Sequence, residues 1–211
     1  MTDQYILVHH PQFTDRLEQL SDRAAKDVAG RDADVVDAAF KALDVLEQGR
    51  ERAFHGERLG FSSKHYDLRD CAEIKVAVFS EYTRSGKPMG PSHRMIYREY
   101  EPPRDDPRPV REVLAFEHRR GGLPYAIAAS AIGRQKGRAV DSLKHLPAPR
   151  PAIGPSKDPD RPITPPRLPL PTDLAAALAT SSRRPPGRPA EATRAMPMRA
   201  SRPAAAHRGR H

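Results

Sequence analysis

The aromatic residues of this 211-residue chain are confined to its first 125 positions. All six Phe and all six Tyr lie between Tyr5 and Tyr125, and none occurs in residues 145–211. That last segment instead holds 15 of the 23 prolines. A chain needs large apolar side chains to offset the entropy that it loses when it becomes ordered. The distribution therefore predicts one folded domain at 1–144 and a disordered, Pro/Ala/Arg-rich tail at 145–211.

Charge divides along the same boundary. The whole chain has a formal net charge of +9, and residues 145–211 contribute +8 of it through 12 Lys and Arg against 4 Asp and Glu. Residues 1–144 are close to neutral, with 24 basic and 23 acidic residues. We therefore expect the tail to bind nucleic acid non-specifically and in a salt-dependent way. The folded part gains little long-range electrostatic steering.

Several classes of protein are excluded by the composition. The single cysteine, Cys71, allows neither an intramolecular disulfide nor a cysteine-based zinc site, and we expect it to be a small core residue. No apolar run reaches the length of a membrane span. The N-terminal residues lack the pattern of a secretory signal. The expectation is a cytoplasmic protein that makes no membrane interaction.

Hydrophobic periodicity predicts two helices and four strands in residues 1–144, with a further short helix as an option. The predicted segments, in chain order, are a strand at 4–9, helices at 11–28 and 32–48, strands within 66–82, at 92–101 and at 110–117, and the optional helix at 125–138. Two helices followed by a run of strands indicate an α+β fold, with the helices packed on one face of an antiparallel sheet.

Basic side chains on the predicted sheet are the candidates for chemistry. Lys75 lies within the first of the three strands, Arg94 begins the next, and Arg119 ends the last. If the strands pair in order, these side chains converge on one face without obvious acidic partners, which suits a phosphate ligand. Tyr125 follows Arg119 by six residues, across a turn at Gly121–Gly122 that is able to fold it back. The competing interpretation is a solvated outer face.

Two short motifs resemble strands of the RelE/ParE toxin superfamily. They are His93-Arg94-Met95-Ile96-Tyr97 and Val113-Leu114-Ala115-Phe116-Glu117-His118-Arg119. The opening YILVHHPQFTDRLEQL is similar to the family's first strand and helix, so the resemblance covers about residues 4–140. It implies a small RelE-like fold and a place in a type II toxin–antitoxin system. RelE-type members cleave mRNA on the ribosome, whereas ParE-type members inhibit DNA gyrase.

Matched residue by residue, the resemblance favours the RelE branch. Arg94 and Arg119 fall on the family's two catalytic arginines. Lys75 falls on its second lysine, and Tyr125 on a tyrosine proposed to stack on or activate the nucleotide. The sequence departs from the family in two places. Glu73 stands where the family has its first lysine, and 18 residues separate Lys75 from Arg94 where the family has a short turn.

The function implied by the resemblance is a ribosome-dependent mRNA endonuclease that uses no metal and no cofactor. A 2′-hydroxyl would attack a phosphate held by the arginines, with Lys75 supplying further positive charge. Glu73 or Tyr125 is the candidate base. His118 is the candidate acid, because imidazole titrates near neutrality. The alternative for His118 is a strand-end histidine bound to the backbone.

The implied partners are mRNA on the ribosome and a cognate antitoxin protein that masks the arginines. Two other functions remain open on the sequence. One is a non-catalytic DNA gyrase inhibitor of the ParE kind on the same fold. The other is a degenerate family member that acts as a nucleic-acid-binding protein through its basic tail.

Overall fold

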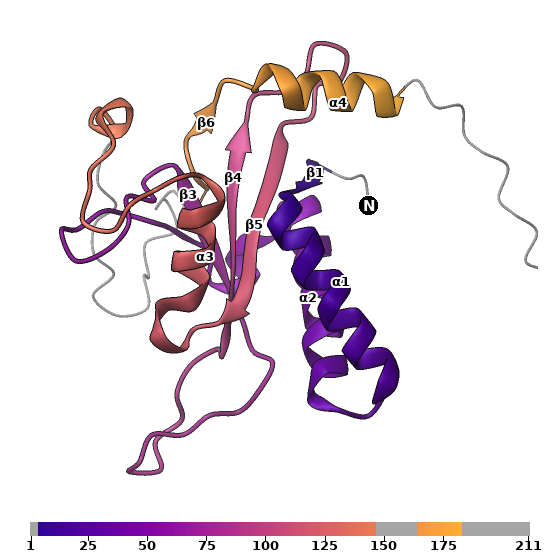
Figure 1. Cartoon of the computed structure of the whole chain (residues 1–211), viewed down its shortest axis with the longest axis vertical. Coiled ribbons are helices and arrows are strands. Elements are labelled where there is room, and N and C mark those ends of the chain that lie inside the picture. The colour runs from indigo at the N-terminus through magenta and orange to yellow at the C-terminus, as the bar shows by residue number, and fades with distance from the viewer. Residues whose placement is uncertain (1–3, 147–163, 183–211) are drawn as a thin grey trace, which may run out of the picture.

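The structure, a computed structural model, describes residues 4–146 and 164–182. Within these residues the chain forms an α+β fold with one open, mixed sheet (Figure 1). The elements in chain order are β1 (Ile6–His9), α1 (Pro11–Lys26), α2 (Arg31–Glu47), η1 (Glu51–Phe54), β2 (Glu57–Arg58), β3 (Cys71–Val76), β4 (His93–Tyr100), β5 (Val110–His118), η2 (Arg120–Gly122), α3 (Leu123–Ala131), η3 (Asp141–Leu143), β6 (Arg167–Leu168) and α4 (Thr172–Ser182).

The two long helices form close to where periodicity predicts them. α1 begins at Pro11, where a residue without an N–H costs no hydrogen bond, and the His10 ring accepts the N–H of Gln12 as a cap. α2 begins just before Asp32 and Asp34, whose charges favour the first turn of a helix. No helix within the described residues is both long and apolar enough to cross a membrane.

The sheet has the strand order β1-β5-β4-β3-β2, and β6 pairs with the part of β4 that lies beyond β3. β3, β4 and β5 are antiparallel neighbours, as predicted, and β2, a strand that was not predicted, is antiparallel to β3. The prediction of a wholly antiparallel sheet is nevertheless wrong, because β1 runs parallel to β5 and β6 runs parallel to β4. Long stretches of chain separate β1 from β5 and β4 from β6, so neither pair is constrained to the antiparallel arrangement of a tight hairpin.

Different helices cover the two faces of the sheet. α1 and α2 lie on one side of β4 and β5, and α3 lies on the other (Figure 1). The first face buries Ile74 and Met95 against α1 and α2. The second buries Cys71 and Ile96 against α3, which confirms Cys71 as a core residue. Because side chains alternate along a strand, Glu73 and the other odd-numbered residues of β3 face α3.

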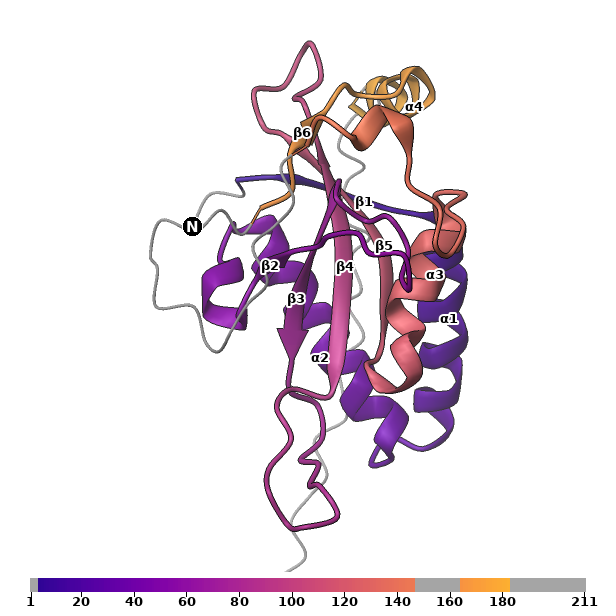
Figure 2. The same cartoon turned by 90° about the vertical axis from the view of Figure 1, so that its left-hand side faces the viewer.

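Residues 164–182 belong to the fold, so the prediction of a disordered tail is wrong for them. β6 pairs with the end of β4, and the N–H of Glu101 donates to the carbonyl of Leu168 at 2.9 Å. α4 follows at the same end of the sheet (Figure 2). Composition does not reveal this segment, because among residues 164–180 only Pro165 is buried, and a two-residue strand and the Arg167–Glu99 ion pair hold the segment to the sheet. Residues 147–163 and 183–211 of the predicted tail lie outside the described residues.

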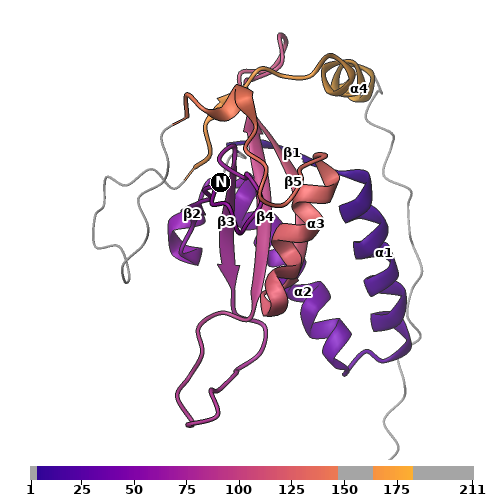
Figure 3. The same ribbon diagram turned by 60° about the vertical axis from the view of Figure 1, so that its left-hand side comes forward.

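The long connection between β3 and β4 extends past the opposite end of the sheet (Figure 3). Its tip is a small hairpin in which the N–H of Thr83 donates to the carbonyl of Lys87 at 2.8 Å. Its base is fixed by Ser92, whose hydroxyl accepts the N–H groups of Val78 and Phe79. Residues 77–92 therefore form an ordered loop next to the ends of β4 and β5.

Candidate active site

Glu73 is the centre of one group of predicted site residues. Its side chain is only 4% exposed, on the face of the sheet that α3 covers. The Tyr125 hydroxyl donates to Glu73 Oε2 at 2.8 Å, while Arg94 Nε and Lys75 Nζ lie 3.5 and 3.8 Å from Oε1. Lys75 and Arg94 share this face because they are opposite each other in the β3–β4 register. We refer to Glu57, Glu73, Lys75, Arg94 and Tyr125 as the Glu73 cluster.

A glycine turn brings Tyr125 to Glu73. Gly121 and Gly122 have φ angles of +67° and +71°, in the left-handed region that glycine adopts without steric cost. The chain reverses there at the end of β5, and α3 starts with Tyr125 in its first turn. The expectation that this turn folds Tyr125 back over the sheet is confirmed.

The environment of the Glu73 cluster separates its two candidate bases. Burial raises the pKa of the Glu73 carboxyl, although the hydrogen bond from Tyr125 and the charges of Arg94 and Lys75 oppose that shift. Burial also raises the pKa of Tyr125, and the neighbouring Glu73 carboxylate raises it further. A phenol shifted in this direction holds its proton more tightly, so it is a poor base. Glu73 is the better candidate.

The basic residues of the Glu73 cluster have acidic partners, which the sequence did not reveal. Lys75 Nζ lies 2.5 Å from Glu57 Oε2 on β2, and both cations flank Glu73. Glu57 lies in a segment without periodicity, so no pattern pointed to it. Arg94 donates to the carbonyls of Pro91 and His93, but its Nε makes no hydrogen bond within the described residues. The cluster is thus neutral overall and keeps one guanidinium donor unused.

His118 and Arg119 belong to a second group, centred on Glu81 of the long loop. Glu81 Oε1 lies 3.0 Å from His118 Nε2 and 3.4 Å from a terminal nitrogen of Arg120, and Oε2 lies 3.1 Å from a terminal nitrogen of Arg119. We refer to Glu81, His118, Arg119 and Arg120 as the Glu81 cluster. The structure therefore brings four of the six predicted site residues together and holds the other two apart from them.

The contacts of His118 indicate which nitrogen of its neutral ring carries the proton. The backbone N–H of Arg120 donates to His118 Nδ1 at 3.1 Å, as the alternative of a backbone-bound histidine predicted. From this contact we infer that the neutral ring carries its proton on Nε2 and donates it to Glu81. Partial desolvation opposes ionisation of Glu81, but the hydrogen bonds from His118 and Arg119 outweigh it and lower the pKa of this carboxyl. Glu81 carries no sequence signal, because it lies in a loop.

Neither a metal centre nor a cysteine nucleophile is evident in the described parts of the chain. Across 4–146 and 164–182, no three His, Cys, Asp or Glu side chains gather in a way that could hold a metal ion. Cys71 is fully buried, and burial raises the pKa of its thiol, which disfavours the reactive thiolate. The chemistry that these residues offer is therefore acid–base and electrostatic.

No protein-family model, curated protein or solved structure matches this chain. Its function has to be inferred from the Glu73 and Glu81 clusters and from the strand motifs in which their residues lie.

Proposed function

We propose that this protein is a metal-independent endoribonuclease of the RelE kind, the toxin of a toxin–antitoxin pair that cleaves mRNA on the ribosome. The observation that carries the proposal is the buried Glu73 carboxylate, with Tyr125, Arg94 and Lys75 within 2.8, 3.5 and 3.8 Å of it. The motif resemblance of β4 and β5 supports the same assignment.

Glu73 is the proposed general base. RNA cleavage of this type begins when a base removes the proton of a 2′-hydroxyl, whose oxygen then bonds to the adjacent phosphorus. A base works best when its pKa lies near the working pH. Burial moves the pKa of Glu73 upward, in that direction. The Tyr125 hydroxyl fixes the orientation of the carboxylate through its hydrogen bond.

The charge balance of the cluster suits the transition state. In the resting protein Glu57 and Glu73 neutralise Lys75 and Arg94. When Glu73 takes the proton it becomes neutral, so the two cations face the phosphorane just as its negative charge develops. Donors placed where charge develops are the strongest electrostatic contribution to catalysis. Arg94 Nε, which in the resting protein lies 3.5 Å from Glu73 Oε1 without a hydrogen bond, is the donor proposed for the phosphorane once Glu73 is neutral.

The leaving 5′-oxygen takes a proton as its bond to phosphorus breaks, and the other product ends in a 2′,3′-cyclic phosphate. Lys75 is the proposed donor, because an arginine stays protonated at any ordinary pH. His118 is less suitable, because its Nε2 proton is engaged by Glu81. The partners under this proposal are mRNA on the ribosome and an antitoxin protein.

The test is an in-vitro translation reaction with the purified full chain, in which mRNA 5′ ends are mapped. Cleavage at the ribosomal A site is expected for the wild type. Glu73→Gln should slow it by about 10²–10⁴-fold, and Arg94→Ala by about 10²–10³-fold. Lys87→Ala is the control, because it removes an exposed charge from the long loop without touching the cluster.

Intact mRNA with a folded wild-type chain would overturn the proposal, as would full activity of Glu73→Gln. In the first case the same preparation is tested against supercoiling by DNA gyrase. Inhibition that survives Arg94→Ala would indicate the ParE kind of function instead.

A further inference from the structure

One carboxylate in the loop between β3 and β4 collects donors from three successive residues at the end of β5. Both oxygens of Glu81 are used, Oε1 by His118 and Arg120 and Oε2 by Arg119. The His118 ring is fixed because its Nδ1 also accepts the backbone N–H of Arg120, whereas the Arg120 side chain is 83% exposed. Such a convergence of imidazole and guanidinium donors on paired oxygens is the geometry that binds a phosphate.

The Glu81 cluster borders an open cavity. The cavity has a volume of about 400 Å³ and is lined by Arg31, Asp32, Val35, Phe79, Glu81, His118 and Arg120, which is within the roughly 300–1,000 Å³ of small-ligand pockets. Arg31 lies over the Phe79 ring at 4.5 Å and adds a further positive charge. With Arg119, the lining and the cluster contain three arginines against two carboxylates. The lining by itself is balanced, so the excess positive charge comes from Arg119, beside the cavity.

The two clusters adjoin a common segment of the loop. Arg119 donates to the carbonyl of Met89, and Arg94 donates to the carbonyl of Pro91, two residues further along. Loop segment 89–91 is therefore contacted by one arginine of each cluster, so a polyanion that follows this segment would pass from one cluster to the other.

We propose that His118, Arg119 and Arg120 form a binding site for a second phosphate of an RNA strand, and that the Glu81 carboxylate is an internal stand-in that the phosphate displaces. This inference rests on the proposed function, since it identifies where the RNA continues beyond the cleaved bond. It also gives Glu81 a positioning role: it keeps the three donors in place when no RNA is bound.

The test measures binding without cleavage. The probe is a fluorescent single-stranded RNA whose riboses are 2′-O-methylated, so that no 2′-hydroxyl is available to attack. Anisotropy titrations use the full chain at several salt concentrations. Glu81→Gln removes the competing charge and should lower Kd by about fivefold, the equivalent of one well-placed ion pair. Glu81→Ala should also lower it, and adding Arg119→Ala to Glu81→Gln should abolish the gain.

Glu117→Gln is the matched control, because the Glu117 side chain is likewise 17% exposed and binds a single arginine, Arg16. Its Kd should equal that of the wild type. Unfolding of every variant by urea separates binding from stability. The proposal is wrong if neither Glu81 variant binds the RNA more tightly, or if Glu117→Gln gains as much. Inorganic phosphate is also added as a competitor of the RNA. If Glu81→Gln binds phosphate more tightly than the wild type does but binds the RNA no more tightly, the assignment to RNA is wrong.

The outcome is independent of the nuclease assay, because the probe cannot be cleaved. Tighter binding by Glu81→Gln together with intact mRNA in the translation reaction would retain the phosphate site and reject the ribonuclease. Cleavage that depends on Glu73, without any gain in Glu81→Gln, would retain the ribonuclease and reject the site.

Discussion

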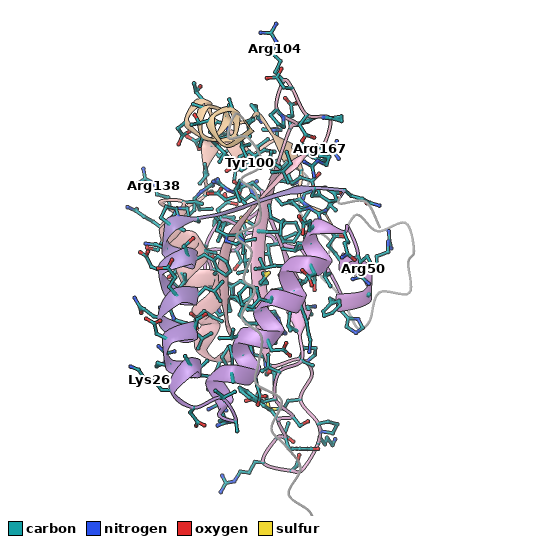
Figure 4. The ribbon with its side chains drawn as sticks, turned by 90° about the vertical axis from the view of Figure 1, so that its right-hand side faces the viewer. Lys26, Arg50, Tyr100, Arg104, Arg138 and Arg167 are labelled. Atoms are coloured by element: carbon teal, nitrogen blue, oxygen red, sulfur yellow. The ribbon has the colours of Figure 1, made fainter. Side chains whose placement is uncertain are left out.

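Two clusters on opposite faces of the same sheet each contain two cations and two carboxylates, but they differ in how deeply the charges are buried. The Glu73 cluster has two cations and two carboxylates on the α3 face. At the other end of β4, on the α1–α2 face, Arg111 and Arg167 meet Glu51 and Glu99, with Tyr5 packed on the Arg111 guanidinium. We refer to these five residues as the Arg111 cluster. Arg167 lies with Tyr100 at this end of the sheet (Figure 4).

What separates the clusters is how deeply their central cations are buried. Arg111 is fully buried, pairs with both carboxylates and donates to the carbonyl of Leu46 at 2.6 Å. In the Glu73 cluster the Lys75 side chain is 25% exposed, and the Glu73 carboxyl has a raised pKa. The Arg111 cluster therefore stabilises the fold around a fully buried charge, whereas the Glu73 cluster is the one that meets RNA under the proposed function.

The largest effect is expected from breaking the enclosed cluster. Arg111→Ala leaves Glu51 and Glu99 buried, with Arg167 alone to offset two negative charges. Removing one partner of a buried ion pair costs about 3–5 kcal/mol, so the variant should lose most of its resistance to urea. The measurement is equilibrium unfolding followed by circular dichroism. Arg108→Ala, which breaks an exposed pair with Asp106, should cost less than about 1 kcal/mol, and equal losses would contradict the contrast.

A smaller loss is expected at the outer side of the Arg111 cluster. Arg167 is half exposed and donates to Glu99 at 2.7 Å. Arg167→Ala in the full chain should cost about 1–2 kcal/mol, the range for a charged hydrogen bond partly screened by solvent. Arg138→Ala, which removes an exposed arginine bound only to Gln135 in the contacts described, should change stability by less than about 0.5 kcal/mol. Equal stability of both variants would show that the Arg167–Glu99 ion pair contributes nothing to stability.

Arg167 also shows what the sequence could not predict about the fold. The helices and the central strands follow from apolar spacing, because burial on one face leaves a period in the chain. Arg167 lies in a Pro-rich stretch without such a period. Its place depends on the Glu99 carboxylate, which is buried far away in sequence and already paired with Arg111. Composition shows that the segment is poor in apolar residues. It does not show that the Arg167–Glu99 ion pair holds the segment to the sheet.

The candidate site was predictable to the extent that strand register determines it. Lys75 and Arg94 were expected to share a face because neighbouring strands align, and they do. Glu57 and Glu81 were missed because their positions depend on a two-residue strand and a long loop. Both are carboxylates. The sequence predicted a bare basic patch, whereas the structure has a neutral Glu73 cluster and a Glu81 cluster in which one carboxylate faces two arginines.

A third effect, about 1–2 kcal/mol, is expected from the turn that delivers Tyr125 to Glu73. A Cβ added at Gly122 meets only Tyr125, at 3.9 Å, so the cost of Gly122→Ala is the strain of its φ of +71°. Gly86→Ala, at φ +77° in the long loop with nothing within 4 Å, is the matched control. Only Gly122→Ala should slow mRNA cleavage by more than its loss of folded protein explains. Equal slowing by both variants would show that the position of Tyr125 does not matter for cleavage.

The smallest expected effect is on the pH dependence of stability, and it has opposite signs for Glu73 and Glu81. Glu73 has a raised pKa, so the stability it contributes is present below its ordinary pKa of 4.5 and is lost as the pH rises through its folded value. Glu73→Gln should therefore unfold at slightly higher urea than the wild type at pH 7, and at the same urea near pH 4.

Glu81 has a lowered pKa, so its contribution to stability is present above pH 4.5 and is lost on acidification. Glu81→Gln should be slightly less stable than the wild type at pH 7, again with no difference at low pH. Shifts of the same sign in both variants would mean that burial does not distinguish the two carboxylates.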